Sequence, residues 1–254
     1  MRFALAICAL ALLMAAPMAP PAEGQTTETR EQQIERIKRE NAKIDEENKL
    51  IQQANAALGA KNWHAAVEPL QKLIALDGDN WQYYTLLGDA EFNLAHYDRA
   101  ADVLKKGVRA AERSKTGDNA KRKAGEARML VTLGNASLKL HDTRAAVDAY
   151  TRAASLAPDP ALAYFNLCAT QYNAGNKQAA LAACDKAIAA DPRKADAYFI
   201  KGSALVGGSR VENGKVVAPP GTVETLRKYL ELEPNGLHAK DAKELLAYVS
   251  GKPK

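Results

Sequence analysis

The feature that most constrains the fold is a spacing of 34 residues that recurs along the chain. This step separates residues of the same type, or small residues, in four sets: Gly134, Cys168 and Gly202; Ala66 and Ala100; Ala146 and Ala180; Pro158 and Pro192. A period of this length is typical of a helix-turn-helix repeat, whose apolar face is buried only when neighbouring repeats stack. Aromatic residues make up only 6% of the chain while alanine is frequent, as expected for helices that pack through small residues.

One stretch resembles a complete tetratricopeptide repeat: ALAYFNLCATQYNAGNKQAALAACDKAIAADP, residues 161–192. Its large, small and terminating residues stand where that family has them: Tyr164, Leu167, Tyr172, Gly175, Ala180, Ala187 and Pro192. Cys168 takes the place of a small glycine or alanine, and Gln171 replaces the usual aromatic residue. The resemblance implies an all-α, right-handed solenoid of about five helix-turn-helix units. The expected repeats are 47–80, 81–114, 127–160, 161–194 and 195–235.

Two stretches interrupt the period. Residues 113–126 hold five Lys or Arg residues, and we interpret them as a solvated loop with helix ends, a basic patch for an acidic partner being the alternative. Residues 209–221 split the last repeat. Within them Asn213-Gly214, flanked by Val211 and Val216, predicts a tight β-hairpin. Residues 238–250 predict a closing helix of the kind that terminal repeats require.

The N-terminus has the layout of a secretory signal peptide. Arg2 is followed by an apolar run over 3–14 and then by small residues, which predicts a signal peptide over 1–24 and a mature start at Gln25. An uncleaved anchor is the alternative, but the run is short for a spanning helix. We expect an exported protein, periplasmic or secreted, whose mature chain has no stable membrane insertion.

Residues 25–46 form a polar, helical, coiled-coil-prone extension with an asparagine at every seventh position. These asparagines share a stripe with apolar residues at the same step: Asn41, Asn48 and Asn55 with Ile37, Ile44, Ile51 and Leu58. One interpretation is a homo-oligomer through residues 28–58, as in periplasmic proteins of the Tol system, which this layout resembles. In a parallel pair of such helices, Glu40 of one chain would lie against Asp45 of the other. This contact between like charges disfavours the homo-oligomer. A lone solvated or disordered segment is the second interpretation.

The third interpretation follows from the resemblance, which implies that the first helix of each repeat lines a concave groove. The expected groove alternates apolar and polar residues: Asn48, Ile51, Asn55, Leu58, Thr85, Asp89, Phe92, Val131, Asn135, Leu138, Phe165, Tyr172 and Phe199. Amide side chains can both donate to and accept from a peptide backbone. We therefore expect the partner to be another protein, bound as a peptide or helix. The function implied is that of a scaffold or assembly adaptor of the bacterial cell envelope.

Catalytic chemistry is not indicated. His64, His96, His141 and His238 lack metal-ligand spacing, and we interpret them as surface residues, mostly in turns. The sequence has no phosphate-binding glycine loop and no nucleophile elbow, so we expect no enzyme, cofactor or metal. The net charge of +5 comes from nearly balanced acidic and basic residues, which does not indicate a nucleic-acid partner.

Two cysteines, Cys168 and Cys184, follow the expected signal peptide. They fall on opposite helices of the fourth repeat, about equally far from Gly175, so antiparallel helices bring them face to face. An oxidising compartment favours a disulfide bond, whereas two buried thiols would be equally ordinary. A thiol-redox or enzyme-accessory protein is a further alternative, although the sequence has no C-x-x-C motif.

Overall fold

The computed structural model describes residues 28–114 and 117–251, and these form eleven helices and one two-stranded sheet. The predicted signal peptide lies outside these ranges. The described residues divide into two compact units, with the boundary between Leu76 and Asp77. Among the described residues, none of the helices combines the length and apolar character needed to span a bilayer.

The first unit is a helix pair, α2 (Arg30–Gly59) and α3 (Trp63–Leu76). A capping box begins α2, because the Thr29 hydroxyl accepts from the Gln32 backbone N–H and the Gln32 side chain accepts from that of Thr29. Against α3, α2 buries only Leu50 and Ala54, both in its second half. The segment from Arg30 to residue 46 is therefore an exposed helix in the structure and is not disordered.

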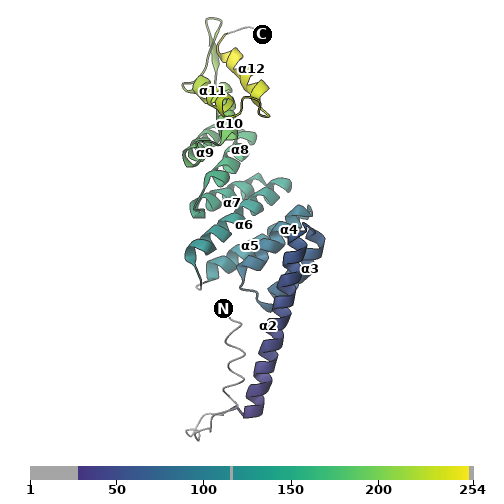
Figure 1. Ribbon diagram of the computed structural model, residues 1–254. Helices are drawn as coiled ribbons and strands as arrows, with labels where there is room; N and C mark the ends of the chain where they lie inside the picture. The colour runs from purple at the N-terminus through teal and green to yellow at the C-terminus, as the bar shows by residue number, and fades with distance from the viewer. Residues whose placement is uncertain (1–27, 115–116, 252–254) are drawn as a thin grey trace, which may run out of the picture. The chain divides into compact units, whose positions relative to one another are not determined.

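The second unit holds four helix pairs and a closing helix, stacked in chain order (Figure 1). The bounds are α4 (Trp81–Asn93), α5 (Tyr97–Arg113), α6 (Asn119–Lys139), α7 (Thr143–Leu156), α8 (Ala161–Asn173), α9 (Lys177–Ala190), α10 (Ala195–Val206), α11 (Thr222–Leu232) and α12 (Ala239–Val249). Each helix packs against the next one along the chain. This arrangement confirms the predicted α-solenoid.

The turns inside the repeats share one backbone conformation. A single residue with positive φ follows the first helix in each of the first four pairs, at Lys61 (53°), Ala95 (59°), His141 (59°) and Gly175 (76°). Of these four repeats, only the fourth uses glycine there, the residue that adopts this conformation without strain. Because the turns match, these four repeats place their two helices in the same register.

Close packing of the two helices in a pair depends on a glycine lying under a large side chain. A Cβ added at Gly134 would lie 2.5 Å from the Tyr150 ring, and one added at Gly88 would lie 2.4 Å from the Leu104 side chain. The fifth repeat pairs Gly202 with Leu226 in the same way. The large partners are all buried, so these contacts form the core of these three repeats.

Within the basic segment 113–126, which was predicted to be a solvated loop with helix ends, most of the described residues belong to the end of α5 and the start of α6. Helix α6 begins at Asn119, where the Asp118 carboxylate accepts from the N–H groups of Ala120 and Lys121. The extra turns are held to α5, because Arg122 donates to the Ala111 carbonyl at 3.2 Å. The insertion therefore lengthens α6 instead of separating two repeats with a free loop.

The predicted hairpin and closing helix are confirmed. Strands β1 (Arg210–Glu212) and β2 (Lys215–Val217) are antiparallel with Val211 opposite Val216. Asn213 and Gly214 both have positive φ, at 51° and 74°, as a two-residue turn of this handedness requires. Helix α12 buries Ala239 and Ala242 against the fifth repeat and leaves a polar outer side.

Candidate functional site

The predicted groove residues of the second unit lie on four first helices, α4, α6, α8 and α10. On α4 and α6 they recur at steps of four and three residues, and on α8 at a step of seven, which places the residues of each helix on one side. We call this side of the four helices the first-helix face. It carries Thr85, Asp89 and Phe92 on α4, Val131, Asn135 and Leu138 on α6, Phe165 and Tyr172 on α8, and Phe199 on α10.

A polar bridge joins α4 to α6 on this face. The Asp89 carboxylate accepts from the Arg128 guanidinium at 2.5 Å and from the Thr132 hydroxyl at 3.1 Å. Asp89 is half-buried whereas the Arg128 side chain is mostly exposed. The bridge fixes the Asp89 carboxylate and leaves one side of the guanidinium open to solvent.

Exposed apolar side chains gather on the parts of the face contributed by α6 and α8. Leu138 is 38% exposed and Tyr172 is 39% exposed. Phe165 is half-buried, and the Lys194 ammonium lies 4.8 Å from the centre of its ring. Two large apolar residues on one helix, one step of seven apart and both reached by solvent, are a candidate docking surface for a protein segment.

Leu162, which is 52% exposed, is not among the residues predicted for the groove. It stands three residues before Phe165 on α8 and 34 residues after Arg128, so the repeat register places it on the first-helix face. The 34-residue spacing that identified the other groove positions also identifies Leu162. With Leu162, the apolar surface of α8 extends over the helix from its first turn to its last.

Three predicted residues have side-chain partners within the fold. Thr85 is only 5% exposed, and its hydroxyl donates to the Trp81 carbonyl at 3.1 Å. Asn135 accepts from the Tyr150 hydroxyl at 2.7 Å. Phe199 stacks on His238 with ring centres 4.2 Å apart. The side-chain oxygen of Asn135 therefore has a structural role, while the binding role predicted for this half-buried residue stays a prediction.

The other four predicted residues belong to α2 in the first unit. Asn55 is exposed, and Ile51 and Leu58 are half-buried. The Asn48 side-chain nitrogen is buried without a hydrogen-bond partner. A continuous groove that includes these residues stays a prediction.

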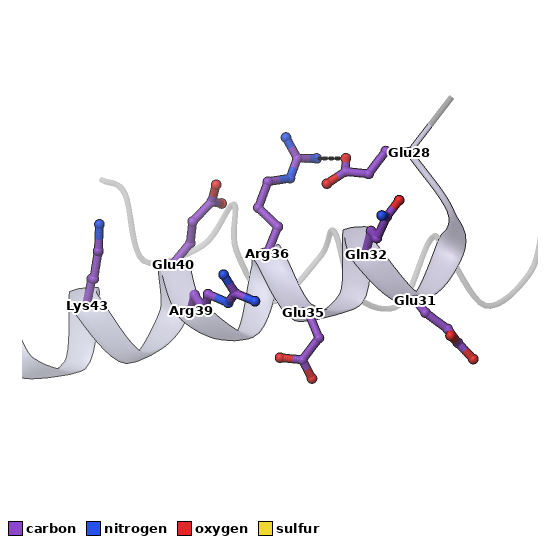
Figure 2. A pocket seen from close by; sticks show the side chains of 8 residues that line it. All are labelled: Glu28, Glu31, Gln32, Glu35, Arg36, Arg39, Glu40 and Lys43. Carbon is purple, nitrogen blue, oxygen red and sulfur yellow. Dashed lines mark ion pairs between the residues drawn. The ribbon is translucent and has the colours of Figure 1, made fainter. Parts of the chain in front are cut away.

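The first half of α2 carries a mixed charged surface, shown from close by in Figure 2. Eight side chains line a hollow along it: Glu28, Glu31, Gln32, Glu35, Arg36, Arg39, Glu40 and Lys43. Arg36 and Glu28 point toward each other and form an ion pair at 3.4 Å. Four acidic and three basic side chains are mixed here, so the surface does not select a ligand of one charge.

Two buried carboxylates have structural partners. Glu91 is buried on α4 and lies 2.7 Å from Nδ1 of His96, which is partly exposed in the turn before α5. Glu126 on α6 lies 3.4 Å from Arg152 on α7 and 3.8 Å from Arg122. Neither carboxylate reaches the first-helix face as a free group, and no cluster of potential metal ligands occurs in the described ranges.

Cys168 and Cys184 are joined by a disulfide bond, with Cα atoms 4.9 Å apart. Both residues are fully buried. Of the two alternatives left open by the sequence, the structure therefore contains the disulfide bond. It connects α8, which carries Leu162, Phe165 and Tyr172, to the second helix of the same repeat.

Known structures share this fold. A protein named MamA matches with a TM-score of 0.61 and 23% identity, over 77% of this chain and 95% of that one. YrrB matches with a TM-score of 0.57 and 22% identity, over 75% and 88%. PilF of Pseudomonas aeruginosa matches with a TM-score of 0.60 and 15% identity, over 83% and 87%. No curated protein matches the sequence significantly.

A sequence profile described as the tetratricopeptide repeat matches residues 51–115, 131–195 and 169–213. Together these matches cover more than half of the chain. They include both helices of each of the first four repeats in whole or in part, and the first helix of the fifth. This chain belongs to the tetratricopeptide repeat family.

Proposed function

We propose that the protein is an interaction scaffold that binds a short, partly apolar segment of another protein on the first-helix face of α6 and α8. The observation that carries this proposal is the run of solvent-reached apolar residues on one side of α8, namely Leu162, Phe165 and Tyr172. A monomeric surface rarely leaves such residues together unless a partner covers them. The family supports the proposal, since stacked repeats present extended binding surfaces.

The chemistry of the face favours a peptide or helix as the bound segment. Apolar positions on α6 and α8 would receive side chains at helical or extended spacing. Next to them, the exposed Arg128 guanidinium and the Lys194 ammonium would favour a segment with a carboxylate beside its apolar residues. YrrB, which shares the fold, is described as having an unusual peptide-binding site.

Peptides selected from a random phage-displayed library on the immobilised full chain provide the probe for this site. A labelled selected peptide should bind Tyr172→Ala about tenfold more weakly than wild type, and Leu162→Ala more weakly as well, because buried aromatic and aliphatic anchors carry most of the binding free energy. The measurement is fluorescence anisotropy. Both variants should keep the thermal stability of wild type, since surface substitutions of this kind change it by about 0.5 kcal/mol or less.

Tyr248→Ala is the matched control. Tyr248 is 52% exposed and lies on α12, which is not one of the four helices that form the first-helix face. Its truncation removes a tyrosine that is at least as accessible as Tyr172 and should leave the Kd unchanged. Wild-type affinity of the selected peptides for both Leu162→Ala and Tyr172→Ala would reject this face as the site.

We also propose that the scaffold acts outside the cytoplasm, in the cell envelope or as a secreted protein. The support is the charged, apolar and small-residue order of residues 1–24, together with a disulfide bond in the fold. N-terminal sequencing of protein purified from the cells that make it should find a start near Gln25. Recovery of Met1 on that protein would contradict export with cleavage.

A further inference from the structure

The disulfide bond occupies the position that the other repeats of the second unit fill with a glycine and a large side chain. Cys168 lies 34 residues after Gly134, and Cys184 lies 34 residues after Tyr150. In the third repeat the tyrosine ring covers the glycine, and in the second and fifth repeats a leucine does so. The fourth repeat has no large residue at this point, and two bonded sulfur atoms join the helices instead.

The rest of the α8–α9 contact is poor in large side chains. The buried residues of α9 are Ala180, Ala183, Cys184 and Ala187. By contrast, α5 buries Leu104 and Val108, α7 buries Tyr150, and α11 buries Leu226 and Tyr229. Since the hydrophobic contribution grows with the apolar area removed from water, α9 gains less from burial than any of these helices.

We propose that the Cys168–Cys184 disulfide is a redox-sensitive latch on the fourth repeat. Reduction breaks the Sγ–Sγ bond, and a dithiol supplies the two electrons and two protons that leave two cysteine thiols and a disulfide on the reductant. The thiols cannot stay at bonding distance, and no large side chain lies at this position to fill the space between the helices. The α8–α9 pair then opens locally while the second and third repeats stay folded.

The latch controls the apolar surface of α8, because that helix carries Leu162, Phe165 and Tyr172. These residues share a side only while α8 is helical and packed on α9. This consequence for binding rests on the proposed function, whereas the latch itself rests on the core of the fourth repeat. A measurement of local opening therefore tests the latch without any partner.

Hydrogen exchange of the full chain, read by mass spectrometry, is the test. The slowest amides of 161–190 should exchange on the order of 100-fold faster in dithiothreitol than in the oxidised protein, as expected when a loop of 16 residues loses its crosslink. Peptides from 127–156 should change by less than about tenfold, since neighbouring repeats are coupled only through their interface. Equal protection of 161–190 in both redox states would overturn the proposal.

The double variant Cys168→Gly with Cys184→Leu is the matched control, because it installs the pair that the second and fifth repeats use. Its 161–190 peptides should be protected and should not respond to the reductant. A dithiothreitol response equal to that of wild type would show that the bond is not the cause, and would also overturn the proposal. If the double variant does not fold, the wild-type comparison alone decides.

Discussion

Tyr150→Ala should lower the free energy of unfolding by about 4 kcal/mol, the largest effect expected of a single substitution in this chain. The ring is almost fully buried and covers Gly134 on the facing helix. Its removal leaves a cavity in the centre of the third repeat, next to a glycine that cannot fill it. Urea unfolding followed by circular dichroism measures the change.

Tyr150→Phe separates the ring from its hydroxyl. Burial raises the pKa of Tyr150 to about 12, so the hydroxyl is a neutral donor to Asn135 across the physiological range. Losing this one hydrogen bond should cost about 1 kcal/mol, and Asn135→Ala should cost a similar amount. In the double variant the two losses should not add, because both substitutions remove the same bond. Additive losses would mean that the bond contributes nothing.

Much of the fold could be predicted from the sequence because each repeat is defined by the spacing of small and large residues within it. A small residue at Gly134 with a large one at Tyr150, and the same step at Cys168 and Cys184, identifies two helices that meet face to face. The Asn213-Gly214 turn could also be predicted, since few other dipeptides adopt its backbone conformation. These features depend on neighbours within one repeat.

The parts of the site that could not be predicted depend on contacts between helices far apart in sequence. For Asn135, the spacing of residues cannot predict whether the side-chain amide is hydrated or accepts a hydrogen bond from the Tyr150 hydroxyl, as it does in the structure. Phe199 is covered by His238, which comes from the closing helix. The point within 113–126 at which α6 begins could not be predicted, because the charged residues indicate solvent, while Arg122 and Glu126 in fact face other helices.

The second large effect is expected at Glu126, whose carboxylate is buried among three helices. Arg152 on α7 contacts both Glu126 and the exposed Glu112 on α5. Burial raises the pKa of the Glu126 carboxyl above its ordinary value, and Arg152 and Arg122 oppose this rise. Arg152→Ala should lower the free energy of unfolding at pH 7 by about 2 kcal/mol, because a buried charge loses one of its two cationic partners.

The loss should shrink as the pH falls. A carboxyl whose pKa is higher in the folded than in the unfolded protein destabilises the fold at pH values where it is charged. The contribution of Glu126 to the free energy of unfolding therefore becomes more favourable as the pH falls through the pKa of the folded protein. Without Arg152, that pKa is higher still. We expect the difference between Arg152→Ala and wild type to be smaller at pH 4.5 than at pH 7, measured by urea unfolding at both pH values.

Two further variants separate the contribution of the Arg152–Glu126 pair from that of the exposed Arg152–Glu112 pair. Glu112→Ala removes the exposed ion pair with Arg152 and should change stability by less than about 1 kcal/mol, partly because it also removes a charge that raises the pKa of Glu126. Adding Glu126→Gln to Arg152→Ala should recover most of the lost stability at pH 7, since a neutral amide has no charge to leave unpaired. A pH-independent loss in Arg152→Ala, unchanged by Glu126→Gln, would assign the effect to the packing of the arginine stem instead.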